Sequence, residues 1–225
     1  MVVAETTNDI LAGLNPHELG LLQEASEEIA LARGQVVAEA GQVASHIYFP
    51  LAGVLSLVGT TGGGATVEVA VVGNDGVASL SSVFGSSGIP FRVVTQVPGR
   101  ALKIPTEVVG SMIVECGELH ERLLRYAGQL MAQLSQSAVC NRFHNARQRL
   151  ARWLLMTADR AASNELLLTH EFISYMVGGP RSAVTEAASE LRESGAIDYR
   201  RGLIIIRDNA LLSEQSCECY AAVKL

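Results

Sequence analysis

The stretch VGGPRSAVTEAASELRESGAI, residues 177–197, constrains the fold more strongly than any other part of the chain. Gly178-Gly179 stops a preceding helix, and Pro180 is tolerated at the first position of a new one. The new helix is expected to end near Gly195. Upstream, Thr169 can cap a two-turn helix that runs up to the glycines. Two short helices around a glycine turn predict a helix-turn-helix. The apolar face of its second helix comprises Val184, Ala187, Ala188 and Leu191.

The next segment, AIDYRRGLIIIRD, predicts a β-hairpin whose turn is Arg200-Arg201-Gly202. A hairpin directly after a helix-turn-helix predicts a winged helix-turn-helix, whose second helix enters a DNA groove. The side chains on the outward first turn and a half of that helix would face DNA: Arg181, Ser182, Thr185 and Glu186. The alternative is an ordinary helical hairpin with a solvated polar face. The combination of a glycine turn, capped helices, a dibasic wing and local positive charge favours DNA binding.

Charge is divided unevenly along the chain. The formal net charge is -6, but residues 140–207 hold 10 arginines against 7 acidic residues, a net charge of +3. Residues 1–139 hold 6 Lys+Arg against 13 Asp+Glu, a net charge of -7. The overall charge argues against a general polyanion binder, whereas the local arginines suit planar contacts to phosphate or guanine. Arginines on a solvated helix face are the other explanation.

The texture of the sequence changes twice. Residues 15–34 predict a helix. Residues 35–104 contain short β-branched runs separated by glycine turns, Gly53 and Gly99 among them, which predicts an antiparallel barrel or roll. From residue 106 to 160 helix formers dominate. The predicted fold class is α+β, with an N-terminal β-roll, a long helix and a C-terminal winged helix-turn-helix.

Within the helical stretch, apolar residues recur at alternating three- and four-residue steps, the pattern of a coiled-coil seam. The seam comprises Leu123, Ala127, Leu130 and Leu134, with Leu124, Met131 and Ala138 on the adjoining edge. One interpretation is that the stripe packs on the protein's own β-roll. Because the second apolar edge leaves room for both contacts, we expect a parallel two-stranded coiled coil between protomers.

Neither a membrane segment nor a catalytic constellation is predicted. The first residues have no basic and no apolar signal region, and no run of 18 uncharged apolar residues occurs. We therefore expect a cytoplasmic protein without membrane contact. No GxSxG or P-loop occurs and the five histidines are scattered, so we do not expect an enzyme.

The four cysteines, Cys116, Cys140, Cys217 and Cys219, include no CxxC, and no histidine pair has zinc spacing. We therefore expect reduced thiols and no metal site. A metal role for Cys217 and Cys219 would need a third and a fourth ligand, which the sequence does not identify.

Taken together, these residues resemble the catabolite activator/Fnr (Crp/Fnr) family of bacterial transcription regulators over nearly the whole chain. RGQVVAEAGQVASHIYFPLAGVLSL, residues 33–57, is similar to the family's cyclic-nucleotide-binding-like β-roll. Residues 106–144 resemble its short helix and long dimerisation helix. The most specific match is LTHEFISYMVGGPRSAVTEAASELRESGAI, residues 168–197, which closely resembles its helix-turn-helix.

The resemblance implies roles for individual residues. Arg181 falls where the family has its guanine-reading arginine, and Ser182 and Glu186 fall at neighbouring base-reading positions. Thr169 and His170 fall at phosphate-contacting positions, and the wing arginines Arg200 and Arg201 are further phosphate candidates. Pro180 replaces a residue that is often Ser or Cys. Ser182 and Glu186 replace the family's frequent Glu and Arg, so we do not expect the family's best-known operator.

The family's effector pocket is only partly kept. The resemblance implies a glycine-rich cradle and an arginine for a cyclic phosphate, and a glutamate for the ribose. Gly73, Gly76 and Arg92 match that frame, but Val77 stands where the glutamate would follow, and Val93 replaces a small hydroxyl residue. We therefore assign no cofactor and do not expect cyclic AMP to bind. The N-terminal cysteine cluster of iron–sulfur members of the family is also missing.

The predicted function is a homodimeric, sequence-specific DNA-binding transcription regulator controlled through an N-terminal sensor domain. The predicted domains are an effector domain (1–116), a dimerisation helix (117–144) and a winged helix-turn-helix (145–225). Expected partners are palindromic double-stranded DNA and a second copy of the chain, with RNA polymerase and a small-molecule effector as further candidates. The alternative is a cyclic-nucleotide-like binding module that does not read DNA, which would have no use for a winged domain.

Overall fold

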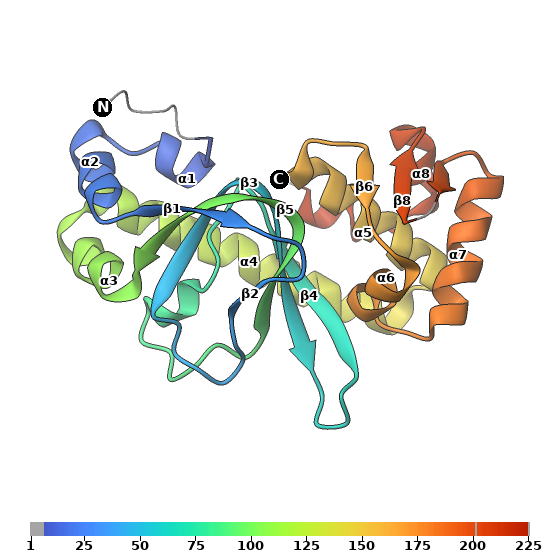
Figure 1. Cartoon of the computed structure of the whole chain (residues 1–225), viewed down its shortest axis with the longest axis horizontal. Coiled ribbons are helices and arrows are strands. Elements are labelled where there is room, and N and C mark those ends of the chain that lie inside the picture. The colour runs from blue at the N-terminus through green and yellow to red at the C-terminus, as the bar shows by residue number, and fades with distance from the viewer. Residues whose placement is uncertain (1–6, 201, 225) are drawn as a thin grey trace. The chain divides into compact units, whose positions relative to one another are not determined.

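The structure, a computed structural model, describes residues 7–200 and 202–224. By its contacts the chain divides into an N-terminal unit, Met1–Leu57 with Val72–Met131, and a C-terminal unit, Val58–Val71 with Ala132–Leu225. The division falls inside one continuous long helix, so the bounds of the three predicted domains stay a prediction. The α+β fold class is confirmed, with a β-roll, a long helix and a helix-turn-helix followed by a hairpin (Figure 1).

The N-terminal unit is built around one antiparallel sheet. The strand order is β1-β5-β3-β4, and β2 pairs with β5. The strands are β1 (Glu27–Leu31), β2 (Val36–Ala38), β3 (His46–Thr60), β4 (Thr66–Val72) and β5 (Arg92–Pro105). The end of β3, from Val58, and all of β4 except Val72 belong to the C-terminal unit. The helices are α1 (Asp9–Ala12), α2 (Pro16–Glu24), the 3-10 turn η1 (Leu80–Ser82), α3 (Thr106–Glu115) and α4 (Gly117–Phe143), which both units share.

The helix predicted for residues 15–34 is too long. Helix α2 ends at Glu24, and β1 follows at once as an antiparallel partner of β5. Strand β1 gains ion pairs from Glu27 to Lys103 and from Glu28 to Arg100, at 3.1 Å each. Pairing with a distant strand thus overrides the intrinsic helix propensity of these residues, because that propensity contributes little free energy on its own.

Two glycines predicted as turns lie inside long strands instead. Gly53 has a φ of +84° but lies within β3, which continues beyond it, and Gly99 lies within β5. A side chain on Gly99 would collide with the backbone of Ala52 and Gly53, and one on Gly53 would collide with that of Val97 and Pro98. The backbones of β3 and β5, which are neighbours in the sheet, therefore approach so closely at these two glycines that only a hydrogen atom fits.

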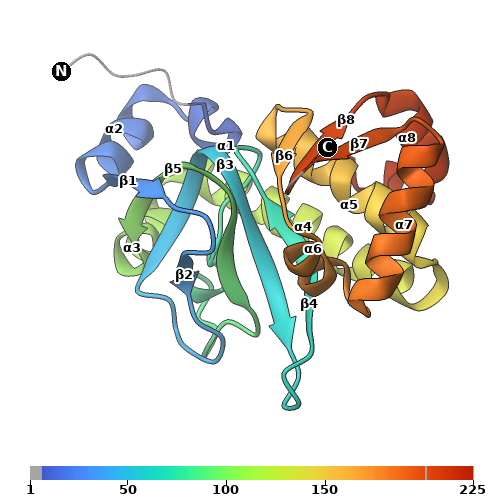
Figure 2. The same cartoon turned by 45° about the vertical axis from the view of Figure 1, so that its right-hand side comes forward.

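The C-terminal unit combines helices with a small three-stranded sheet of order β6-β8-β7 (Figure 2). Helix α5 packs against α6, α7 and α8. The elements are α5 (Ala146–Ala161), β6 (Glu165–Leu167), α6 (His170–Val177), α7 (Arg181–Glu193), β7 (Ile197–Arg200), β8 (Leu203–Ile206), α8 (Asn209–Gln215) and the 3-10 turn η2 (Ala221–Val223).

The helix-turn-helix is confirmed in detail. Thr169 is the N-cap of α6, its hydroxyl accepting from the Phe172 amide at 3.2 Å. Gly178 and Gly179 turn the chain with φ values of +69° and +150°, which strain residues other than glycine. Pro180 is the N-cap of α7 rather than its first residue, so the helix begins one position later than predicted. All four apolar residues predicted for the inner face of α7 are buried.

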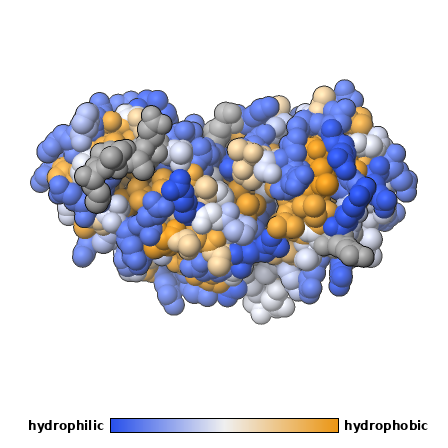
Figure 3. Space-filling view, turned by 45° about the horizontal axis from the view of Figure 1, so that its top comes forward, coloured by the Kyte–Doolittle hydropathy of each residue, from blue (hydrophilic) through white to orange (hydrophobic). Residues whose placement is uncertain are grey.

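Hydrophilic residues cover most of the face drawn in Figure 3, with hydrophobic residues in patches between them. Among the described residues, no helix has both the length and the apolar character needed to cross a membrane.

Candidate functional site

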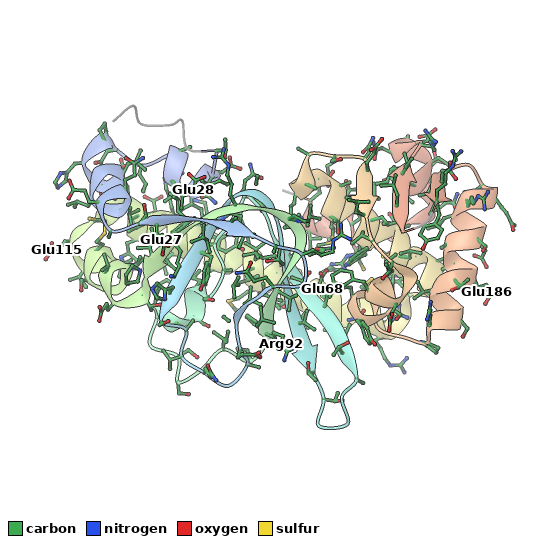
Figure 4. All side chains as sticks on the ribbon, viewed as in Figure 1. Glu27, Glu28, Glu68, Arg92, Glu115 and Glu186 are labelled. Atoms are coloured by element: carbon green, nitrogen blue, oxygen red, sulfur yellow. The ribbon has the colours of Figure 1, made fainter. Side chains whose placement is uncertain are left out.

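The outward face of α7 carries the four residues predicted to read DNA. Arg181, Ser182, Thr185 and Glu186 are all exposed, whereas the opposite face is buried. Figure 4 shows Glu186 extending outward from the helix. The periodicity of 3.6 residues explains this division, because burying one face of α7 turns the polar face to solvent.

The N-terminus of α7 is open to an anion. Its N-cap, Pro180, makes no side-chain hydrogen bond to the first turn. The Ala183 amide donates to the carbonyl of Pro180 at 3.0 Å, whereas the first two N–H groups of a helix have no carbonyl to bond within it. The helix dipole adds a partial positive charge there. Arg181 stands at the first helical position and adds a full charge. This end of α7 therefore offers backbone and side-chain donors to a phosphate or a base edge.

Thr185 is held by its own helix. Its hydroxyl donates to the carbonyl of Arg181 at 2.9 Å, and the Ser189 hydroxyl donates to the carbonyl of Thr185 at 3.1 Å. A base-reading role for Thr185 stays a prediction.

The β7–β8 hairpin, predicted as the wing, is organised by one acidic residue. Asp198 is mostly buried, and its carboxylate lies 3.1 Å from Arg200 Nε, 3.2 Å from Arg207 Nη2 and 3.8 Å from Arg192 Nε. The hydrogen bond from Arg207, with help from the Tyr199 amide and the charge of Arg200, holds the pKa of Asp198 below its usual value. The Arg200 guanidinium stays largely exposed at the end of the hairpin. Arg201, the second wing arginine, lies outside the described residues.

The phosphate candidate Thr169 lies beside the wing. Thr169 is exposed and lies next to Gly202 in the hairpin turn. A Cβ atom at Gly202 would be 3.8 Å from the Thr169 methyl group. The Leu168 amide donates to the carbonyl of Gly202 at 2.7 Å, which fixes the start of α6 against the turn of the hairpin. The side chain of His170, the other candidate, lies outside the described part of the chain.

The amides of two predicted effector residues, Gly73 and Gly76, already have acceptors within the protein. The Gly73 amide donates to Asp75 Oδ1 at 2.9 Å, and the Gly76 amide donates to the carbonyl of Gly73 at 3.1 Å. Val77 is fully buried. The space at Gly76 is taken by the ring of Tyr126 from α4, with which a Cβ would collide. The glycine at position 76 is thus explained by packing against α4.

Arg92 is engaged at the protein surface. Its Nε lies 3.0 Å from Glu39 Oε2, and both side chains are about half exposed. Figure 4 places Arg92 where β5 begins. Because an exposed ion pair of this kind contributes only about 0 to 1 kcal/mol, Arg92 could exchange Glu39 for another anion at small cost.

The predicted dimer seam on α4 needs one correction. Leu123 is fully buried by its own protomer, so it does not lie on a face that a second chain could contact. Ala127, Leu130 and Leu134 are half-buried and stay candidates for the interface. The apolar side chains that α4 presents to solvent are on the adjoining edge, with Leu124 52% and Met131 67% exposed.

A group of residues that the sequence reasoning did not assemble lies in the C-terminal unit. Cys140 and His144 come from the end of α4, and Cys217 and Cys219 follow α8. Their ligand atoms all lie within 4.8 Å of one another. The signal in the sequence was a cysteine and a histidine four residues apart on a helix, which share one face.

Comparisons with known proteins agree with this architecture. The family model of a cyclic nucleotide-binding domain matches residues 28–116, and that of a Crp-like helix-turn-helix domain matches residues 148–215.

Among curated proteins, the chain is 22% identical over 214 residues to the CRP-like cAMP-activated global transcriptional regulator of Mycobacterium tuberculosis, covering 92% of this chain and 96% of the relative. It is 25% identical over 193 residues to the global nitrogen regulator of a Nostoc species, covering 81% and 86%. The solved structure of FixK2 from Bradyrhizobium japonicum has the same fold, with a TM-score of 0.73, 14% identity and coverage of 85% and 98%.

The ion pairs of Asp198 predict a pH dependence of stability. The pKa of this carboxyl is lower in the folded than in the unfolded chain, where it is about 3.9. The stabilisation is therefore present above about pH 4 and is lost as the pH falls through the folded pKa. Thermal unfolding followed by circular dichroism should show a lower Tm for Asp198→Asn than for the wild type at pH 7, and a smaller loss of Tm between pH 5 and 2. Arg207→Gln, which removes the main partner, should flatten the profile in the same way. Parallel pH profiles for all three proteins would contradict this assignment.

Proposed function

The chain belongs to the Crp/Fnr family of transcription regulators, and we propose that it acts as a homodimer that reads a two-fold-related DNA site through α7. The observation that carries this proposal is the uncapped N-terminus of α7, which begins with an exposed arginine above a fully buried apolar face. In helix-turn-helix proteins the N-terminal residues of the second helix contact base edges. The half-sites of a dimer then lie about one helical turn, ~34 Å, apart.

Each element of the interface has its own task in this proposal. Arg181 donates two parallel hydrogen bonds to a guanine edge. Ser182, Thr185 and Glu186 contact the neighbouring bases, Glu186 by accepting from a cytosine amino group or by repelling wrong sequences. Thr169 and Arg200 contact phosphates on either side of the groove, since they lie on the start of α6 and on the adjoining hairpin.

The homodimer rests on the exposed apolar edge of α4. Leu124 and Met131 are seven residues apart, one heptad, and both are more than half exposed in the single chain. Large apolar side chains at this spacing on one face are typical of a helix–helix interface. With the half-buried Ala127, Leu130 and Leu134 beside them, they form a stripe that a second copy can cover.

We further propose that the N-terminal unit does not bind cyclic AMP by the family's usual chemistry. The amides of Gly73 and Gly76 already have acceptors, and a buried valine takes the place of a ribose-binding glutamate. A nucleotide bound there would leave polar groups without partners, at about 1 to 3 kcal/mol for each. We therefore propose that the N-terminal unit responds to a different effector or to none.

The remaining roles follow from transcription regulation. A regulator of this kind works in the cytoplasm, where the DNA is, and contacts RNA polymerase when it activates a promoter. It needs no catalytic chemistry of its own.

Dimerisation through α4 can be tested with Met131→Lys. The change places a charge inside an apolar interface, where it lacks a partner, so the protein should become monomeric at micromolar concentration in analytical ultracentrifugation. Because Met131 is exposed in the single chain, the variant should keep its helical circular dichroism. Gln129→Lys, at an exposed position away from this edge, is the matched control and should stay dimeric. A monomeric wild type would contradict the proposal.

DNA reading can be tested by comparing Arg181→Ala with Arg200→Ala. Selection from random DNA should yield a palindrome for the wild type. Arg181→Ala should lose about 1 to 3 kcal/mol of discrimination at one base pair of each half-site. Arg200→Ala should weaken binding to specific and random DNA by similar factors, and should reduce the salt dependence by about one phosphate contact. Failure to select any palindrome, or equal effects of both variants on sequence preference, would refute these assignments.

The effector proposal can be tested by calorimetric titration with cyclic AMP and cyclic GMP. The missing partners should raise the dissociation constant from the micromolar toward the millimolar range, a change of about 4 kcal/mol. Arg92→Ala should change the heat of binding little. A low micromolar dissociation constant that Arg92→Ala abolishes would show that Val77 and Val93 do not prevent binding.

A further inference from the structure

The four residues Cys140, His144, Cys217 and Cys219 form a candidate metal centre in the C-terminal unit. Cys140 and His144 are one turn apart at the end of α4, and the His144 amide donates to the carbonyl of Cys140 at 3.1 Å. Cys217 and Cys219 lie in the segment between α8 and η2. Two stretches of chain that are more than 70 residues apart thus bring three thiols and one imidazole to a single point.

We propose that these residues bind one zinc ion as a closed Cys3His site. The sulfur atoms of Cys140 and Cys217 are 3.6 Å apart, and Cys219 Sγ lies 3.4 Å from His144 Nδ1. In a tetrahedral zinc site, with zinc–sulfur bonds of about 2.3 Å and zinc–nitrogen bonds of about 2.0 Å, neighbouring ligand atoms lie about 3.5 to 3.8 Å apart. All four ligand atoms lie within 4.8 Å of one another, which is close enough for a single ion to bind them all.

The geometry distinguishes zinc from two other uses of cysteine. A disulfide has a sulfur–sulfur distance of about 2.05 Å, and all four cysteines are free in the structure. An iron–sulfur cluster holds its ligands on separate irons bridged by sulfide, which needs more room than these four atoms enclose. Three thiolates and one imidazole in a closed tetrahedron are a donor set typical of structural zinc.

The three thiols of the candidate site are buried together. The three cysteines form a buried cluster of their own, with exposed fractions of 5% or less. A bound divalent cation would supply the positive charge that the three thiolates need.

Neighbouring groups are arranged as the outer shell of a metal site. Glu218 Oε1 lies 3.3 Å from His144 Nε2, so it accepts the ring proton there and leaves the Nδ1 lone pair directed at Cys219. This carboxylate–histidine arrangement recurs in zinc proteins, where it fixes the tautomer. The Gln136 amide donates to Cys219 Sγ at 3.0 Å, as an amide does to a metal-bound thiolate.

The buried Arg152 supplies a charge that the proposed site uses. Its side chain is 8% exposed, Nη2 donates to Ser137 Oγ at 3.2 Å, and Nε has no hydrogen-bond partner among the described residues. Burial raises the pKa of the Cys140 thiol, and the nearby positive charge of Arg152 acts against that shift. One zinc ion with three thiolates and a neutral imidazole carries a charge of -1, which the guanidinium balances.

The zinc ion would fasten the segment after α8 to the end of α4. The next residue after the ligands, Tyr220, donates its hydroxyl to Asp159 Oδ2 on α5 at 2.8 Å. The segment is thus held at two points, once by the ion and once by this hydrogen bond. Loss of the ion is expected to lower the Tm of the protein, because binding to the folded state alone stabilises that state.

The decisive experiment is metal analysis of the full chain, purified without added metal, by inductively coupled plasma mass spectrometry. The wild type should hold one zinc per chain. Cys140→Ser and Cys217→Ser should lose it, whereas Cys116→Ser, at a buried cysteine of the N-terminal unit, should keep it. Glu218→Gln should bind zinc about tenfold more weakly in a chelator competition.

Cobalt substitution of the wild type keeps the test independent of how the variants fold. Apoprotein prepared with a chelator under reducing conditions should take up one Co²⁺ and show the intense visible bands of a tetrahedral site together with sulfur-to-cobalt charge transfer. Zinc should displace the cobalt and abolish the bands. Reduced wild-type protein that binds neither ion, a disulfide between Cys140 and Cys217 in place of the metal, or equal zinc in Cys140→Ser and Cys116→Ser would overturn the proposal.

Discussion

Everything proposed for DNA recognition depends on the burial of one face of α7. Val184, Ala187, Ala188 and Leu191 are each at most 3% exposed, and α7 packs on both α5 and α6. Burial of that face sets the rotation of the helix about its own axis, so the exposed face is determined as well. Alanines at two of the four positions let the helices approach closely. The first turn of α7 can serve as a rigid interface only because its other side is fixed.

Much of the C-terminal fold could be predicted because its signals are local. Glycines at 178 and 179 have positive φ values that other residues adopt only with strain, and Thr169 forms the cap that its type favours. Apolar residues on either side of the turn at Arg200 and Gly202 formed the expected hairpin. Each of these features is decided by residues a few positions apart, which a single sequence contains.

The errors concern contacts between distant parts of the chain. The sequence of residues 27–31 favours a helix, but these residues form a strand that pairs with β5, more than 65 residues further along the chain. Leu123 matched a coiled-coil seam and is buried in its own protomer, because periodicity does not tell which of two partners covers a stripe. The four candidate zinc ligands were each visible in the sequence, but nothing local shows that the end of α4 and the segment after α8 meet. Gly53 and Gly99 were interpreted as turns for the same reason: the close approach of the two strand backbones that requires them joins distant residues and leaves no local signal.

Proline at position 180 carries a consequence for the evolution of this surface. The hydroxyl oxygen of a serine or threonine cap would accept a hydrogen bond from an amide in the first turn of α7 and stabilise the free protein by about 1 kcal/mol. Pro180 gives up that gain, while its restricted ring holds the backbone in the conformation that the turn needs. No side chain caps the first turn of α7, so its leading amides can serve the nucleic-acid ligand proposed above. Selection at this position would favour pre-organisation for binding over stability of the unbound state, a trade-off in which the most stable variant is not the best regulator.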